Sequence, residues 1–343
     1  MFEYYDDELF SVLERNQYYI SDGDAELGCV IGSDVKCIED MGVSIQVVMS
    51  IIAGESYKVQ AVKGGYNLND LGRKIVSSLS IEPVSIMAYF ESNTLSEYFH
   101  VFAKARQGLR DDGLLFQVCA DSYSRKVALE AVDKFVSVVM SLAGNAIFRR
   151  RVREYERCAK NNSAGMNELI DSIFTKHSKV LVLRVDFGYS LPYLHSLAGV
   201  VCSERVRRDM ARFIKDLNKS VLKKGLLGYL WKLEFGPMKQ FHYHCMFFLN
   251  GSKFQKDIVI ATKLGEHWKS VVTNGDGVYF NCNNDKDNYP YQALGEKLRS
   301  DPEGVGFVKK AAEYLVKLDW VVRPNLPSGR RTFGRSQALK VKL

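Results

Sequence analysis

The sequence lacks the patterns that several classes of protein require. Its seven cysteines are an odd number without a C-x-x-C pair, which argues against a disulfide framework and against a cysteine zinc module. The longest nearly apolar run, residues 135–148, is shorter than the roughly 20 residues of a membrane span, and no charged-then-apolar leader opens the chain. A G-x-x-x-x-G-K-[ST] phosphate loop is also missing. We therefore expect a cytoplasmic protein with no membrane segment and no helicase motor of its own.

Charge is unevenly distributed along the 343 residues. Residues 1–110 hold 9 Lys and Arg against 16 Asp and Glu, a net charge of −7. Residues 111–343 hold 38 against 24, a net charge of +14. A basic region of this size is typical of a protein that binds a polyanion such as nucleic acid. A solvated basic surface has the same composition, so charge alone leaves both interpretations open.

The length predicts two domains. We expect an N-terminal accessory domain of mixed α/β structure over residues 1–125, a helical connector of one or two helices over 126–160, and a functional domain over 161–343. Residues 43–53 are apolar enough for a buried strand or a short helix. Asn161, Asn162, Ser163 and Gly165 form the expected linker. No role for the accessory domain follows from its sequence.

Beyond the linker, the pattern predicts an α+β domain in which helices flank an antiparallel sheet. Strands are expected at residues 179–187, 226–235 and 240–250, the last two joined by a turn at Gly236-Pro237. Helices are expected at residues 203–224 and 307–320. This order of elements, with hairpins in place of regular β-α-β repeats, favours an antiparallel sheet over a parallel one.

The strand expected at 240–250 contains His242 and His244. Alternation places both on one face, about 7 Å apart along the strand, where their nitrogens can converge on one divalent metal. If the hairpin turns around Met238, Glu234 lies opposite His242 on the same face. Two imidazoles and one carboxylate suit Mg²⁺ or Mn²⁺ at a catalytic site and can also hold Zn²⁺. Two histidines packed in a sheet without metal are the alternative.

The helix expected at 307–320 carries Tyr314 and Lys317 on one face, with Lys310 one turn earlier. A phenol can attack phosphorus once its proton is lost, and a neighbouring ammonium can hold the phosphate or the phenolate. The alternative is a half-buried core tyrosine, because Tyr314 also fits the apolar stripe of this helix.

A two-histidine strand followed about 70 residues later by a Tyr-x-x-Lys helix resembles the replication-initiator branch of the HUH endonucleases. The match is closer for four segments, which resemble the inovirus-type replication initiator family that includes the YagK/YfjJ-like prophage proteins. These segments are KVLVLRVDFGYS, LEFGPMKQFHYHCMFFLNGS, GEHWKSVVTNGDGVYFNCNN and YLVKLDWVVRPNLPSGRRTFGRS. The resemblance covers roughly residues 161–340.

This resemblance implies a rolling-circle replication initiator, which is a metal-dependent single-strand DNA endonuclease and strand transferase. A divalent metal, Mg²⁺ or Mn²⁺, would be held by Glu234, His242 and His244. Tyr314, assisted by Lys317, would attack the phosphorus and become linked to the 5′ end. The freed 3′-OH would prime synthesis, and the reverse transfer would reseal the strand.

The resemblance also implies supporting residues and partners. Arg184 and Asp186 match the first motif strand of the family and are expected to support the site. Four basic residues are expected to contact DNA: Lys310, Arg330, Arg331 and Arg335. The implied partners are single-stranded or hairpin DNA at a replication origin and a helicase of the bacterial host acting in trans. A single tyrosine in the motif implies that a second subunit, as in a homodimer, or a second protein performs the second cleavage.

Two other functions remain open from the sequence. One is a non-cleaving origin or operator binder of prophage or mobile-element origin, which the intact metal and tyrosine motifs argue against. The other is a phosphodiesterase that activates water, with Tyr314 structural. Four aromatic residues lie among basic and polar ones and either stack on unpaired bases or pack in the core: Trp268, Tyr279, Phe280 and Tyr291.

Overall fold

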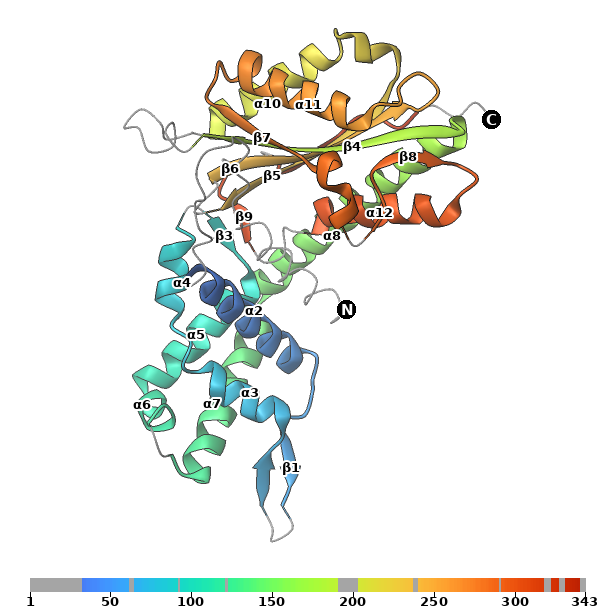
Figure 1. The fold of residues 1–343 in the computed structure, drawn as a ribbon. Coiled ribbons are helices and arrows are strands. Elements are labelled where there is room, and N and C mark those ends of the chain that lie inside the picture. Colours follow the sequence, from blue (N-terminus) through green and yellow to red (C-terminus); the bar gives the residue numbers. More distant parts are fainter. Residues whose placement is uncertain are drawn as a thin grey trace. The chain divides into compact units, whose positions relative to one another are not determined.

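The computed structural model divides the chain into two compact units. It describes residues 33–339 except 62–64, 92, 121–122, 191–202, 237–239, 290, 318–321 and 327–330. Of these, residues 33–157 and Val322 belong to the first unit, and residues 158–317 and 323–339 to the second. Helices and antiparallel strands both build the chain (Figure 1), so the expected α+β fold class is confirmed.

Helices dominate the first unit. They are α2 (Ser33–Ile52), α3 (Asp70–Ser78), α4 (Pro83–Tyr89), α5 (Glu97–Asp111), α6 (Leu114–Val118) and α7 (Arg125–Ala143). Its strands are short: β1 (Lys58–Gln60) pairs with β2 (Tyr66–Leu68), and β3 spans Asn93–Leu95. Strand β9 (Val322–Pro324) lies where the chain passes from the first unit to the second. Almost all of the segment at 43–53 belongs to α2, which packs Ile45 and Val48 into the same apolar core as Phe102.

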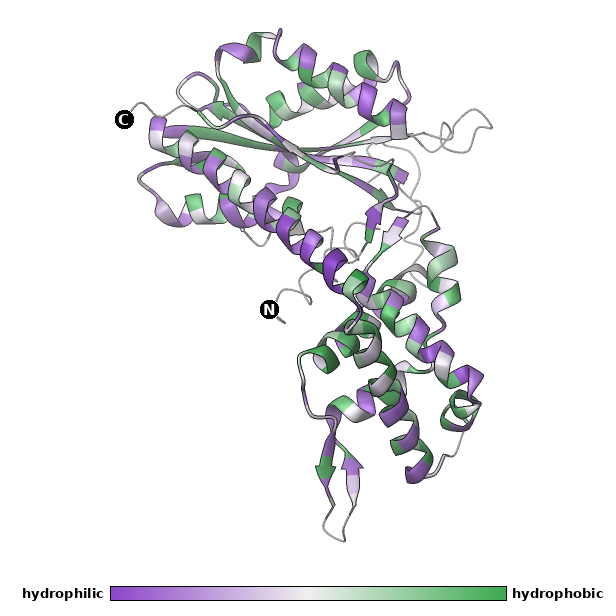
Figure 2. Cartoon of the chain, turned by 180° about the vertical axis from the view of Figure 1, so that it is seen from behind, coloured by the Kyte–Doolittle hydropathy of each residue, from purple (hydrophilic) through white to green (hydrophobic). Residues whose placement is uncertain are grey.

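Helix α8 (Ala146–Lys176) runs without a break through the segment expected to be a linker, so the linker prediction at residues 161–165 is wrong. The first half of α8 is hydrophilic (Figure 2), whereas its second half buries Met166, Leu169, Ile170 and Ile173. This spacing is the apolar face of a helix, and its burial outweighs the weak helix propensity of the Asn-Asn-Ser stretch before it. The region 126–158 therefore forms two helices, α7 and the start of α8.

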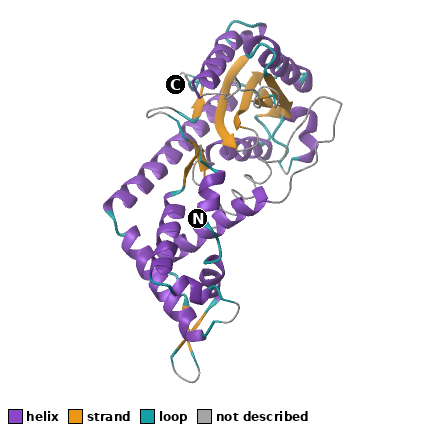
Figure 3. Ribbon diagram, turned by 90° about the vertical axis from the view of Figure 1, so that its left-hand side faces the viewer, coloured by secondary structure: helices purple, strands orange, loops and turns teal. Residues whose placement is uncertain are grey.

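The second unit is built on one antiparallel sheet (Figure 3) in the order β10-β5-β6-β4-β7, with β8 also paired to β4. The strands are β4 (Lys179–Tyr189), β5 (Leu226–Gly236), β6 (Gln240–Asn250), β7 (Gly277–Asn281), β8 (Gly295–Leu298) and β10 (Phe333–Arg335). The three predicted strands are confirmed to within two residues at each end. Of the turn predicted at Gly236-Pro237, Gly236 ends β5 opposite Gln240, and Pro237 lies outside the described part.

The two predicted helices are present with shifted ends. Helix α10 (Ser203–Leu217) starts at the expected residue, but the chain continues after it as a short 3-10 turn at Val221–Lys224. Helix α12 (Pro302–Lys317) starts five residues earlier than expected. The structure adds α11 (Asp257–His267), which the sequence analysis did not predict.

Strand β4 separates two cores. Leu183, Val185 and Phe187 pack with residues of α10 and α11, whereas Val180 and Val182 pack with residues of α8 and α12. Successive side chains of a strand point to opposite faces, so α10 and α11 cover one side of the sheet and α8 and α12 the other (Figure 1). On the α8 and α12 side, β4 changes from apolar to polar after residue 182.

Gly265 lets α11 lie close to the sheet. A Cβ atom at this position would overlap the ring of Tyr279 on β7. Gly-to-Ala changes inside helices ordinarily stabilise by up to about 1 kcal/mol, but overpacking typically costs about 1–3 kcal/mol. We therefore expect Gly265→Ala to lower the free energy of unfolding of the second unit by about 1–2 kcal/mol, measured by calorimetry.

Gly306 in α12 provides the matched control, because no atom lies within 4 Å of a Cβ built there. Gly306→Ala should raise the free energy of unfolding by about 0.5–1 kcal/mol through helix propensity alone. If both variants gained stability equally, the close approach of α11 to Tyr279 would be wrong.

Candidate metal centre

The pairing of β5 with β6 gathers polar side chains on the α8 and α12 side of the sheet. Glu234 lies opposite His242, which confirms the register expected from the sequence. The next pair on this face is Lys232 opposite His244. The two imidazoles are buried, 7% and 3% exposed. Two histidines and one carboxylate are thus held on a rigid sheet and shielded from most solvent.

The distances within this group match the needs of a metal ion. Glu234 Oε2 lies 3.6 Å from His242 Nε2 and 3.3 Å from His244 Nε2. One ligand atom from each residue lies within 4.8 Å of the other two. Metal bonds of about 2.0–2.2 Å at angles near 90–110° separate neighbouring ligand atoms by about 2.8–3.6 Å. Both Glu–His distances agree with this range.

Each imidazole is oriented through its other nitrogen. His242 Nδ1 lies 2.9 Å from the main-chain oxygen of Gln240, and His244 Nδ1 lies 2.8 Å from Asp186 Oδ2. Carbonyl and carboxylate oxygens only accept hydrogen bonds, so each Nδ1 carries a proton, and each Nε2 faces Glu234, where a bound metal ion would take the place of a proton. Partners of this kind fix the ring and raise the basicity of a metal ligand. Asp186, which the sequence analysis expected to support the site, thus contacts one of the two histidines.

The carboxylates around His244 also control its protonation. Burial lowers the pKa of His244, but Asp186 and Glu234 together outweigh burial and raise that pKa above its ordinary value of 6.5. Asp186 also forms an ion pair with Arg184, whose Nε lies 3.7 Å from Asp186 Oδ1. Burial likewise lowers the pKa of Arg184, whereas the Asp186 charge raises it and prevails, so this guanidinium keeps its charge.

Arg184 connects this group to α12. Its guanidinium carbon lies 5.6 Å from the centroid of the Tyr314 ring and 5.8 Å from that of Tyr289. Both distances are within the range of a cation–π contact. Tyr314 is half-buried. Lys317 is the last described residue of α12, and its side chain lies outside the described part. Tyr314 thus lies on the same side of the sheet as the two histidines, with its ring beside Arg184.

Two buried polar residues of this region were missed by sequence reasoning. Asn283 accepts a hydrogen bond from the Arg184 main-chain N–H at 2.8 Å and donates to the Val182 oxygen at 3.0 Å, which fixes β4 beside the site. Lys232 is 1% exposed and donates to Thr332 Oγ1 at 3.5 Å. Alternation along β5 places Lys232 on the same face as Glu234, so the strand pattern alone predicts that Lys232 lies beside the site.

The residues expected to contact DNA lie in different surroundings. Lys310 and Arg331 are exposed. Arg335 is half-buried and pairs with Glu168 at 3.3 Å, so it ties β10 to α8 within the second unit. Arg330 lies outside the described residues. The structure therefore gives Arg335 a packing role and leaves Lys310 and Arg331 accessible to a ligand.

The four aromatic residues considered for base stacking also differ. Trp268 is fully buried in the core on the α10 side, and Phe280 packs against the core on the α12 side. Tyr279 is half-buried against α11. Tyr291 is 41% exposed, with the Lys310 ammonium 4.9 Å from its ring centroid. Of the four, Tyr291 is therefore the one that is exposed and has a cation beside its ring.

The fold and the site together define an α+β protein with a His-His-Glu group set on an antiparallel sheet. The family model for the YagK/YfjJ C-terminal domain matches residues 149–336, which include Glu234, His242, His244 and Tyr314. This match covers more than half of the chain, and the protein belongs to the YagK/YfjJ C-terminal domain family. Neither the curated proteins nor the solved structures compared with the chain gave a match. Among the helices that the structure describes, none combines the length and apolar character needed to cross a membrane.

The contact between Asp186 and His244 leads to a prediction about metal affinity. Asp186→Asn should weaken Mn²⁺ binding about 10–100-fold, because an amide oxygen can still orient the ring but no longer raises its basicity. Calorimetric titration with Mn²⁺ measures this change. Asp216→Asn is the control, since Asp216 lies 3.2 Å from His267 Nε2 on the other side of the sheet. Unchanged affinity in Asp186→Asn would rule out its supporting role.

The raised pKa of His244 leads to a second prediction. A proton on Nε2 competes with the metal, so Mn²⁺ affinity should be highest above the raised pKa and fall by up to about tenfold per pH unit below it. Because that pKa lies above 6.5, the fall should begin at a higher pH than for an ordinary histidine. Titrations between about pH 6 and pH 8.5 test this. Affinity that stays constant down to pH 6.5 would contradict it.

Proposed function

We propose that the second unit is a metal-dependent endonuclease and strand transferase for single-stranded DNA, of the HUH type. The protein would initiate rolling-circle replication at the origin of a prophage or inovirus-like element. The observation that carries this proposal is the convergence of Glu234, His242 and His244 on the side of the sheet that α12 covers. The order of a histidine strand before a tyrosine helix supports the replication-initiator type within that superfamily.

The charges on this face suit a phosphodiester. The carboxylates of Asp186 and Glu234 are balanced by the cations of Arg184 and Lys232, and the imidazoles that bind metal are neutral. A divalent ion would therefore leave the group with a net charge of about +2, which attracts a phosphate. Such an ion, when bound, polarises a non-bridging phosphate oxygen. Arg184 supplies further positive charge beside the Tyr314 ring.

Tyr314 is the proposed nucleophile. Its phenolic oxygen would lose its proton and form a bond to phosphorus while the bond from phosphorus to the 3′ oxygen breaks, and the leaving 3′ oxygen takes up one proton in turn. The 5′ phosphate stays on the tyrosine, so the energy of the broken linkage is kept and resealing requires no ATP. A second strand transfer would need a second tyrosine, which a homodimer supplies. Unwinding would be done by a host helicase in trans.

Tyr289 is the other tyrosine beside Arg184, and its surroundings favour Tyr314 as the nucleophile. Burial and the neighbouring Cys282 raise the pKa of the Tyr289 phenol well above its ordinary value, which opposes formation of a phenolate. Tyr314, in contrast, lies on the helix that carries the exposed Lys310 one turn earlier.

The test compares these two tyrosines in one assay. Oligonucleotides labelled at the 5′ or 3′ end, taken from the element's own genetic neighbourhood, are incubated with protein and Mn²⁺ or EDTA and resolved on a denaturing gel. Wild-type protein and Tyr289→Phe should give a metal-dependent, protein-linked band that carries the DNA downstream of the nick. Tyr314→Phe should lose that band completely while still binding the DNA.

Other outcomes would identify other functions. Cleavage without a protein-linked band would indicate an activated water nucleophile. Binding without cleavage of hairpin or unpaired substrates, with or without metal, would favour the non-cleaving origin binder. Loss of the band in Tyr289→Phe but not in Tyr314→Phe would reverse the assignment of the nucleophile. His242→Ala and His244→Ala should each lose metal-dependent cleavage.

A further inference from the structure

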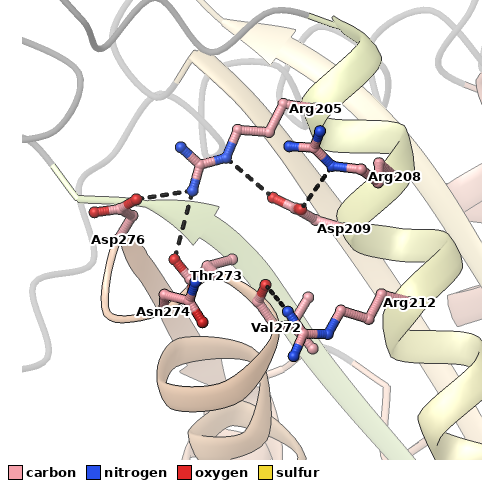
Figure 4. A pocket seen from close by; sticks show the side chains of 8 residues that line it. All are labelled: Arg205, Arg208, Asp209, Arg212, Val272, Thr273, Asn274 and Asp276. Carbon is pink, nitrogen blue, oxygen red and sulfur yellow. Dashed lines mark hydrogen bonds and ion pairs between the residues drawn. The ribbon is translucent and has the colours of Figure 1, made fainter.

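A second polar feature lies on the side of the sheet opposite the metal centre. A pocket of about 510 Å³ opens between α10 and the turn that precedes β7 (Figure 4). It is lined by Arg205, Arg208, Asp209, Arg212, Val272, Thr273, Asn274 and Asp276. Three arginines against two carboxylates give this lining an excess of positive charge, and none of its side chains is aromatic.

Contacts with the fold hold two of these arginines in place. Arg205 Nη2 lies 2.8 Å from Asp276 Oδ2, and its Nε lies 3.4 Å from Asp209 Oδ2. Arg212 Nη1 donates to the main-chain oxygen of Val272 at 3.3 Å. Asp209 is itself buried and accepts a hydrogen bond from the Tyr189 hydroxyl at 2.8 Å. The guanidinium groups are therefore positioned around a hollow before any ligand arrives, which lowers the entropy lost on binding.

The positive charge continues along α10 beyond the pocket. Arg208, Arg212 and Lys215 are exposed and follow one another at helical spacings of four and three residues, so they form one stripe. The stripe is about 10 Å long at 1.5 Å per residue. Over that length, a DNA duplex presents about six phosphate charges. Arg208 and Arg212 pair with Asp209 and Asp216 at 4.0 Å each, and ion pairs of exposed arginines at such a separation are weak.

We propose that the α10 side of the second unit binds the phosphate backbone of double-stranded DNA next to the cleaved strand. That the ligand is DNA rests on the proposed function. That it is a duplex rests on the residues that line the pocket. Surfaces that bind single strands stack unpaired bases on aromatic rings, which this pocket lacks. A duplex hides its bases and offers phosphates, for which fixed guanidinium groups suffice. The exposed Tyr291 instead contacts Phe307 and Lys310 of α12, the helix on the other side of the sheet.

The test removes the stripe and measures binding to a blunt DNA duplex of about 24 base pairs by fluorescence anisotropy over a range of salt concentrations. The variant carries Arg208→Gln, Arg212→Gln and Lys215→Gln, all at exposed positions. Its affinity should fall at least tenfold at moderate salt. The slope of log affinity against log salt should become shallower by about 2–3, as expected for three lost phosphate contacts.

The control variant carries Lys36→Gln, Arg110→Gln and Lys126→Gln, three exposed basic residues of the first unit. It has the same net charge, so equal loss of affinity in both variants would overturn the proposal. An equal loss for an unpaired oligonucleotide of the same length would overturn the choice of duplex. Tight binding of polyglutamate that depends on the stripe, with duplex binding unchanged, would indicate an acidic protein partner instead.

Cleavage of an unpaired oligonucleotide by the wild-type protein is scored separately. If the wild-type protein never cleaves, the proposed nuclease function fails, but the comparison of duplex affinities still decides whether α10 is a DNA-binding face.

Discussion

The antiparallel pairing of β5 with β6 decides whether Glu234, His242 and His244 meet on one face of the sheet. Side chains alternate along both strands, so a slip of one residue would move Glu234 to the face of Leu233 and Tyr243 and separate it from the histidines. Leu233 and Tyr243 belong to the apolar core under α10, where exchanging them for a carboxylate would be strongly unfavourable. The burial of apolar side chains on one side of the sheet therefore fixes the arrangement of ligand atoms on the other.

The polar side of the sheet is stabilised by a chain of contacts among its own charges. Burying a single carboxylate or guanidinium would cost several kcal/mol, which opposite charges and hydrogen bonds offset. Here Glu234 meets both imidazoles, Asp186 meets His244, and Arg184 meets Asp186. The contacts that orient the ligand atoms thus also offset the free energy lost when the neighbouring charges are buried. Such a network holds the imidazoles in one orientation, which is what a metal site of defined geometry requires.

Local patterns account for what the sequence predicted well. The period of two on β4, β5 and β6 predicted the strands and their faces, and the short hairpin predicted the register that places Glu234 opposite His242.

The wrong linker prediction at residues 161–165 shows the limit of local rules. Gly165 looks like a break in the chain, yet a side chain there would collide with the guanidinium of Arg335. That contact joins residues about 170 positions apart, as does the pair of Arg335 with Glu168, and no local pattern predicts either. Asn283 and the α10 pocket depend in the same way on distant segments meeting.

Strand β4 connects the two polar sides of the sheet. Asp186 holds His244 on the metal side, and three residues later Tyr189 holds Asp209, which in turn holds Arg205 in the α10 pocket. Three residues of a strand span about 10 Å, and pairing with β7 throughout this length and with β6 up to Phe187 resists bending. A duplex bound at α10 would therefore lie at a set distance from the metal centre across the sheet. In the proposed function, a fixed spacing of this kind would let the position of the paired DNA determine which phosphate of the unpaired strand reaches Tyr314.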